Sequence, residues 1–223
     1  MSLKYYEAYN ERYKKVHEEG IQWFCSESSP IVADIIAKYN IQPHMHLLEL
    51  GCGEGRDAQK LLKSGYNLLA TDISQEAINY CKNLIPDYAG HFKVLDCVNG
   101  CLPEKYDFIY AVAVIHMLLL DEDRNGFYKF IYNHLTTEGL ALICSMGDGK
   151  TERKSDINTA FELQERECCG KRIMVAGTSC RMVNVETFER EIKENNLNIV
   201  EIGQTCIPNE FSEMMYAVVS KQI

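Results

Sequence analysis

Residues 47–55 read Leu-Leu-Glu-Leu-Gly-Cys-Gly-Glu-Gly, and this stretch decides the fold that the sequence predicts. Its apolar start is typical of a buried strand, and the three alternating glycines that follow make a turn without Cβ atoms. Residues 57–62 then place apolar side chains at helical spacing. Strand, glycine loop and helix N-terminus, in this order, let a nucleotide-like ligand lie against bare backbone in an α/β protein.

Three further apolar runs follow the glycine loop, at residues 68–70, 92–95 and 106–112. The first ends at Asp72, and an acid at the end of the second strand can accept hydrogen bonds from both hydroxyls of a ribose. The second ends at Asp96 and Cys97, and the third leads into Ala113. Each of these residues stands where a predicted strand ends.

The pattern Glu-x-Gly-x-Gly-x-Gly, which begins at Glu49, resembles motif I of the class I S-adenosylmethionine (SAM)-dependent methyltransferases. A dinucleotide-binding loop would carry its third glycine at position 56, which is Arg here. The resemblance covers about residues 45–145. Within the family, Gly-Cys-Gly-Glu-Gly-Arg-Asp followed by Gly65-Tyr66 is also similar to the tellurite-resistance and thiopurine methyltransferase branch.

The resemblance implies SAM as the cofactor, S-adenosylhomocysteine as the product and a set of contact residues. Asp72 would bind the ribose and Ile73 would lie against the adenine face. Asp96 would accept a hydrogen bond from the adenine amino group, and the Cys97 backbone N–H would donate to a ring nitrogen. The full set of implied cofactor-binding residues is Glu49, Gly51, Cys52, Gly53, Arg56, Asp72, Ile73, Asp96, Cys97 and Ala113.

Several of these residues also fit ordinary structural roles. Asp72 could instead cap the helix that begins near Ser74, because Asp and Ser are both good capping residues. Asp96 could be a turn residue. Arg56 could reach the carboxylate of the cofactor or only occupy the first turn of its helix, and Glu49 could be a polar residue near a strand end.

The alternation of strands and helices predicts one α/β domain over residues 1–223, with a mostly parallel sheet and helices on both faces. Periodicity and helix-end signals predict helices at 3–19, 31–39, 75–84, 121–135 and 185–195, and later strands at 139–144, 199–202 and 215–219. The resemblance adds a Rossmann-like sheet of seven strands in the order 3-2-1-4-5-7-6, with strand 7 antiparallel.

Two segments are expected to cover the ligand edge of this sheet. Residues 146–182 form a long polar connection after the fifth strand, and connections of that length are commonly functional. A hairpin is expected around residues 172–175. Residues 1–29 are the other candidate lid, in which Tyr6 and Trp23 could exclude water and contact the substrate, or only pack on the domain.

The resemblance implies methyl transfer by in-line displacement and supplies no universal catalytic residue. His116 follows the fourth strand and is the candidate general base and substrate contact, although it also suits a helix start or a core position. Arg181 or Arg172, both in the insertion, is a candidate for binding a substrate carboxylate.

The composition favours a small-molecule acceptor. The net charge is −9, whereas nucleic-acid binding requires clusters of Lys and Arg. No apolar run approaches 20 residues and the first residues are polar, so neither a membrane span nor a signal peptide is expected. The ten cysteines contain no Cys-x-x-Cys, so a cytoplasmic protein with reduced cysteines and no metal is predicted. The role of Cys168 and Cys169, the oligomeric state and the acceptor atom stay open.

Two other functions are compatible with the same loop. One is a SAM-binding regulatory protein without catalysis, because methyl transfer requires no particular side chain that the sequence could show. The other is a nicotinamide-dependent oxidoreductase, which Arg56 and the absence of a Tyr-x-x-x-Lys pair on a suitable helix disfavour.

Overall fold

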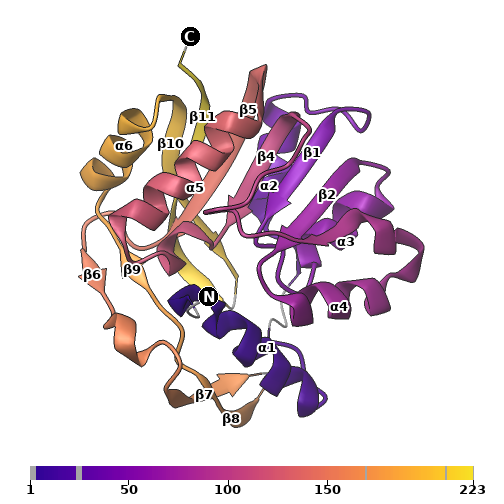
Figure 1. Ribbon diagram of the computed structural model, residues 1–223. Helices are drawn as coiled ribbons and strands as arrows, with labels where there is room; N and C mark the ends of the chain where they lie inside the picture. Colours follow the sequence, from indigo (N-terminus) through magenta and orange to yellow (C-terminus); the bar gives the residue numbers. More distant parts are fainter. Residues whose placement is uncertain (1–3, 24–26, 169, 209, 223) are drawn as a thin grey trace.

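The computed structural model describes residues 4–23, 27–168, 170–208 and 210–222. A seven-stranded sheet forms its centre, in the order β10-β11-β5-β4-β1-β2-β3 (Figure 1). The strands are β1 His46–Leu50, β2 Asn67–Asp72, β3 Phe92–Val94, β4 Tyr106–Val112, β5 Leu135–Met146, β10 Leu197–Ile207 and β11 Phe211–Lys221.

The predicted sheet order and direction are confirmed. Strands β3, β2, β1, β4 and β5 pair in parallel, and β11 runs antiparallel to both β5 and β10. The last strands are longer than the sequence predicted. Strand β5 begins at Leu135 and extends to Met146, since β4 pairs with its first residue and β11 with its last. The parallel strand ends gather at one edge of the sheet.

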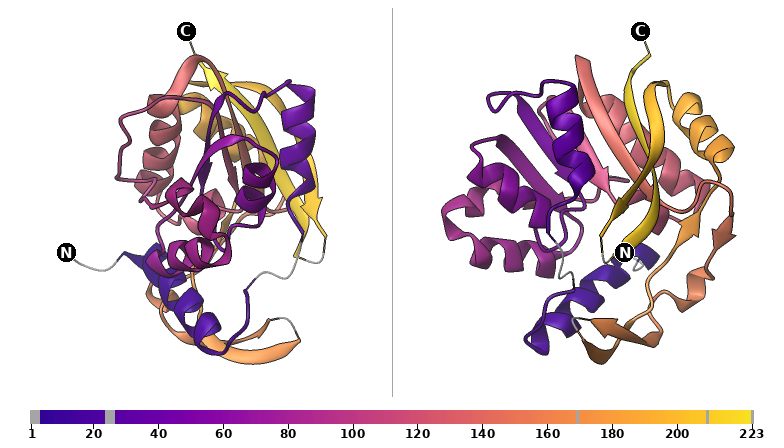
Figure 2. Two further views of the ribbon diagram at one scale, coloured as in Figure 1. Left: turned by 90° about the vertical axis from the view of Figure 1, so that its right-hand side faces the viewer. Right: turned by 180° about the vertical axis from the view of Figure 1, so that it is seen from behind.

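Helices cover both faces of the sheet (Figure 2). Strand β4 shows why, since Phe108, Tyr110 and Val112 belong to one apolar core and Ile109 and Ala111 to the other. This alternation follows from the two-residue period of a strand. The core that contains Phe108 packs against α2 Pro30–Lys38, α3 Arg56–Lys63 and α4 Gln75–Leu84, and the other core against α5 Asp121–His134 and α6 Val185–Glu194.

The N-terminal segment and the insertion lie next to each other beyond the ligand edge of the sheet (Figures 1 and 2). The expected first helix begins as a 3₁₀ turn, Tyr5–Glu7, and continues as α1 Ala8–Glu18. The expected hairpin is present as β7 Leu163–Cys168 and β8 Lys171–Ala176. The rest of the insertion holds β6 Arg153–Lys154, the 3₁₀ turn Ile157–Thr159 and β9 Arg181–Met182, which pairs with β6.

No helix in the described ranges combines the length and the apolar character that crossing a membrane requires.

The Cys168 thiol donates to the backbone oxygen of Gln22 at 2.7 Å, which ties the hairpin to the N-terminal segment. Cys169 lies outside the described residues.

Candidate active site

A cavity of about 220 Å³ opens at the edge of the sheet where β1, β2 and β4 end. It collects all ten of the residues that the resemblance implies for cofactor binding, from Glu49 in β1 to Ala113 after β4. Tyr6 lines it as well, as predicted for the N-terminal segment. The structure therefore brings the ten positions together around one space, and their contacts with a cofactor stay predictions.

The glycine loop holds this cavity open by a backbone conformation that side chains disfavour. Gly51, Gly53 and Gly55 have φ angles of 73°, 52° and 78°. A Cβ atom on Gly51 would lie 2.4 Å from Cγ2 of Val114, so the loop also touches the segment after β4. Glycine is required here for both conformation and space.

Asp72 is buried at the end of β2 and is fixed by two backbone groups. Its Oδ2 accepts a hydrogen bond from the Gly53 N–H at 2.9 Å, and its Oδ1 accepts one from the Ser74 N–H at 2.8 Å. Burial raises the pKa of Asp72, although these N–H groups oppose the shift. The cap of α4 is Ser74, whose side chain accepts a hydrogen bond from the Ala77 N–H, and Asp72 binds the N–H of this capping residue. The Asp72 carboxylate thus supports the glycine loop and the start of α4 while it lines the cavity, which is compatible with the predicted ribose role.

Asp96 connects the cavity to the N-terminal segment. Lys4 Nζ donates to its Oδ2 at 2.6 Å and the Tyr6 hydroxyl donates to the same atom at 3.4 Å. Oδ1 accepts a hydrogen bond from the Val98 N–H at 2.9 Å. Burial raises the pKa of Asp96, but the Lys4 and backbone hydrogen bonds outweigh it and hold this pKa below its usual value. The residue implied for adenine binding is therefore ionised and covered by the chain's own N-terminal side chains.

Arg56 lines the cavity, but its guanidinium is engaged by the protein. It forms an ion pair with Glu210, which follows β10, and its Nε lies 3.8 Å from Asp57 Oδ2. Of the two roles that fitted the sequence, the structure shows the residue in the first turn of α3, paired with carboxylates.

Glu49 is buried, and the Tyr110 hydroxyl donates to its Oε2 at 3.0 Å. Burial, together with the nearby Asp57 carboxylate, raises the pKa of Glu49 well above its ordinary value. The folded protein therefore keeps a proton on Glu49 at pH values where the unfolded chain has released it. The contribution of Glu49 to stability must fall as the pH rises from the ordinary glutamate pKa to the raised folded value.

Replacement of Glu49 by Gln is expected to remove this loss of stability. Each pH unit between the unfolded and folded pKa values costs about 1.4 kcal/mol. Urea unfolding of both proteins at pH 4 and pH 8 should therefore show similar stabilities at pH 4 and a more stable variant at pH 8. Parallel pH profiles for the two proteins would show that Glu49 is ionised in the folded state.

A second cavity of about 470 Å³ adjoins the first, since Tyr9 and Met117 line both. It lies between the N-terminal segment, the insertion and the turn after β4, and Trp23 and His116 are among its walls. Two of the predicted substrate contacts therefore meet here, whereas Tyr6 belongs to the first cavity.

His116 lies in the 3₁₀ turn Ile115–Met117 and is 4% exposed. Burial, reinforced by the positive charge of Arg124, lowers its pKa to about 3. Its Nδ1 has no hydrogen-bond partner among the described residues. A histidine with this pKa is neutral at pH 7 and is a weak base, so its ring is suited to forming a hydrogen bond rather than to carrying a proton away.

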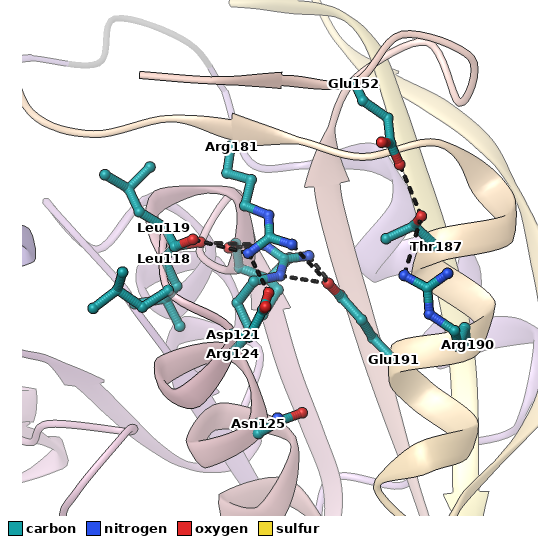
Figure 3. Close-up of polar contacts among 12 residues, drawn as sticks. Leu118, Leu119, Asp121, Arg124, Asn125, Glu152, Arg181, Thr187, Arg190 and Glu191 are labelled. Atoms are coloured by element: carbon teal, nitrogen blue, oxygen red, sulfur yellow. Dashed lines mark hydrogen bonds and ion pairs between the residues drawn. The ribbon is translucent and has the colours of Figure 1, made fainter. Parts of the chain in front are cut away.

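The predicted substrate contact Arg181 lines neither of these two cavities, and Figure 3 shows it beside Leu119 and Asp121. Its Nη1 donates to the Leu119 backbone oxygen at 2.8 Å and to Asp121 Oδ1 at 2.6 Å. The neighbouring Arg124 is 1% exposed and forms a two-bond ion pair with Glu191, at 2.8 and 2.6 Å. Arg181 thus joins the end of the insertion to the first turn of α5, where side chains of the protein occupy its guanidinium.

Arg124 also positions the turn that carries His116. Its Nη1 donates to the Ile115 oxygen at 2.7 Å, directly before the histidine. Ser179, in the insertion, donates to the Met117 oxygen at 2.6 Å. This turn is therefore held from two sides, by α5 and by the insertion, while it lines the second cavity.

The sequence did not predict several residues that line the two cavities, since they lie outside the glycine loop and the acids at the strand ends. Val114 and Met117 follow β4 without any distinctive spacing, and Arg12 was one polar position in an amphipathic helix. Thr178 has a φ of 60°, which is unusual for a β-branched residue, but only the backbone coordinates reveal it. Arg153, which lines the second cavity, stands in the stretch Lys150-Thr151-Glu152-Arg153-Lys154, whose three basic residues were the one signal in the sequence.

No group of three or more His, Cys, Asp or Glu side chains within the described ranges is arranged to hold a metal ion. The fold and the cavities define a Rossmann-like α/β protein with a nucleotide-type site at the carboxyl edge of its sheet.

Comparison with known proteins narrows this class. A family described as methyltransferase domain matches residues 48–141. Phosphoethanolamine N-methyltransferase 1 of Zea mays is 22% identical over 221 residues, covering 92% of this chain and 42% of that protein. Malonyl-acyl-carrier-protein O-methyltransferase of Bacillus anthracis is 23% identical over 186 residues, covering 82% of this chain and 66% of that protein.

A solved structure shares the fold over the whole chain. The 1,6-didemethyltoxoflavin-N1-methyltransferase of Burkholderia thailandensis, with bound 1,6-didemethyltoxoflavin and S-adenosylhomocysteine, aligns with a TM-score of 0.73 and 13% identity. The alignment covers 100% of this chain and 92% of that one. Residues 48–141 therefore match a methyltransferase domain, and the chain has the fold of the class I SAM-dependent methyltransferases. It spans 42% and 66% of the lengths of the two curated relatives.

Proposed function

We propose that this protein transfers the methyl group of SAM to a small-molecule acceptor. The observation that carries the proposal is the pair of adjoining cavities. One gathers Asp72, the glycine loop and the other implied cofactor residues, and the second meets it at Tyr9 and Met117. The relatives, which are named as methyltransferases, support the same reaction class.

The residues of the first cavity suit an adenosine with an attached amino acid. Asp72 offers fixed carboxylate oxygens for two ribose hydroxyls, and the glycine loop leaves backbone accessible beside it. Ile73, Val112 and Leu95 supply apolar surface for a flat base. SAM supplies a methyl group on a sulfonium, which is a good leaving group and needs no covalent catalyst.

The protein's task is then to orient the acceptor and to exclude water. The second cavity positions the acceptor, and the Tyr9 and Met117 side chains stand where the two ligands meet. His116 serves as a hydrogen-bonding partner of the acceptor in this proposal. Residues 1–29 and 146–182 act as the covering segments of a single domain, and the hydrogen bonds from Arg12 to the Ala176 oxygen, at 2.8 and 3.1 Å, join them.

Calorimetric titration of the purified protein with SAM, S-adenosylhomocysteine and NADH tests the cofactor assignment. We expect binding of the first two in the micromolar range (about −8 kcal/mol) and no heat from NADH. Binding of NADH alone would replace the proposal with the oxidoreductase alternative. Tight SAM binding without turnover on a broad panel of acceptors would favour a regulatory SAM-binding protein instead.

A further inference from the structure

We propose that the second cavity takes an acceptor that carries an anionic group, a carboxylate or a phosphate, and that Arg12, Arg153 and Arg166 recognise this group. The inference rests on the proposed function, because it names the chemical class of the methyl acceptor. Three observations on the walls of the second cavity support it. These are the positive charges, the burial of Arg12, and the buried Nδ1 atom of His116, which has no partner among the described residues.

The walls concentrate positive charge without any compensating acid. Arg12, Arg153 and Arg166 line the cavity, and no Asp or Glu is among the described residues that do so. None of the three arginines forms an ion pair with another residue in the part of the chain that the structure describes. In a protein with a net charge of −9, three cations around an acid-free cavity make a local site for an anion.

Arg12 is the fixed member of the three. It is 5% exposed, and its guanidinium donates to the backbone oxygens of Ala176 and Gly177 at 2.8 Å. The same group lies over the Trp23 ring, 4.3 Å from the ring centroid. A carbonyl oxygen does not neutralise a guanidinium, so the cavity wall retains a buried positive charge. The hydrogen bonds hold this charge in place before a substrate binds.

Arg153 and Arg166 are exposed and come from two strands of the insertion, β6 and β7. Arg166 donates to the Gln164 side chain, which also lines the cavity, and to the Glu165 backbone oxygen at 3.1 Å. The insertion thereby brings two arginines to a cavity whose third arginine comes from α1. An anion bound among them would hold the insertion and the N-terminal segment together.

The other walls indicate an organic acceptor with a hydrogen-bonding group. Trp23, Phe211 and Met146 supply apolar surface. The Nδ1 atom of His116 is buried without a partner among the described residues, and leaving such an atom unsatisfied is costly. An acceptor that exchanges a hydrogen bond with this nitrogen and places its anion at the arginines would satisfy both.

The experiment uses the single tryptophan of the chain as its reporter, since Trp23 lines the cavity. The full-length protein, with saturating S-adenosylhomocysteine, is titrated with benzoate, phenyl phosphate and benzamide while tryptophan emission is recorded. Benzoate and benzamide have nearly the same shape and differ in charge. We expect a saturable change with benzoate or phenyl phosphate and none, or at least about tenfold weaker binding, with benzamide.

Matched variants locate the effect. Arg153→Gln and Arg166→Gln should each raise the dissociation constant of the anionic probe by about three- to fivefold, as expected for exposed charges. Arg172→Gln is the control, because Arg172 lies in the same hairpin, is 76% exposed and does not line the cavity. Equal binding of benzoate and benzamide, or equal losses in all three variants, would overturn the inference.

Titration of the same variants with SAM separates this inference from the proposed function. We expect all three variants to bind SAM as the unchanged protein does, since Arg153, Arg166 and Arg172 do not line the first cavity. Intact SAM binding with no preference for the anionic probes contradicts only the anionic acceptor. Failure of the unchanged protein to bind SAM contradicts the proposed function itself.

Discussion

Replacement of Asp72 by Ala is expected to weaken SAM binding by more than tenfold. The carboxylate offers acceptors for two ribose hydroxyls, and losing a hydrogen bond at a buried site costs about 1–3 kcal/mol. The same substitution removes the acceptor for the Gly53 N–H, so the glycine loop also loses its anchor to β2. Both effects act on the same ligand, and calorimetric titration with SAM measures their sum.

Asp87→Ala is the matched control for this prediction. Asp87 lies in the 3₁₀ turn Pro86–His91, is exposed and does not line the first cavity. Its removal should leave SAM affinity unchanged. Circular dichroism and thermal unfolding establish that both variants are folded. A folded Asp72→Ala protein with unchanged affinity would show that the ribose is bound elsewhere.

Replacement of Gly51 by Ala is expected to damage both the fold and SAM binding. A residue with a Cβ atom pays about 1–2 kcal/mol at the φ of 73° that Gly51 adopts. The new Cβ would also lie 2.4 Å from Val114 Cγ2, and overpacking of this kind costs about 1–3 kcal/mol. Urea unfolding should therefore show a loss of about 2–5 kcal/mol, and displacement of the loop should abolish SAM binding at micromolar concentrations.

Gly65→Ala separates the two causes. Gly65 ends α3 with a φ of 82°, but a Cβ atom there would meet nothing within 4 Å. The Gly65→Ala protein should therefore lose only the stability that the unfavourable φ angle costs, and it should bind SAM as the unchanged protein does. The double variant Gly51→Ala/Val114→Ala should recover part of the stability, because the clashing methyl group is gone. Equal losses for Gly51→Ala and Gly65→Ala would show that the contact with Val114 is unimportant.

The sequence predicted the parts of the protein whose signals are local. A glycine loop between an apolar run and a helical pattern is written in consecutive residues, and so are acids at the ends of the following strands. Asp72 and Asp96 could be assigned to one ligand because they occupy the positions of the family pattern, in the order of the family. The strand order itself came from the resemblance, which carries topology that periodicity cannot supply.

The predicted boundaries of the last two strands were less accurate, because strand pairing is not a local signal. Strands β10 and β11 extend well beyond the runs expected at 199–202 and 215–219. Their added residues include polar ones such as Gln204 and Ser220, which pair through the backbone rather than through an apolar face. Antiparallel partners stabilise such residues in a strand, and a single sequence does not display its partners.

The sequence by itself determined the domain type, the glycine loop and the set of positions around the first cavity. Only the tertiary structure decided the second cavity, since Arg12, His116 and Arg166 come from segments far apart in the chain. It also decided that Arg181 is held by Asp121 and the Leu119 oxygen rather than placed at either cavity. The physical reason is that the position of a charged side chain depends on the groups that it binds, and these groups become its neighbours only when the chain folds.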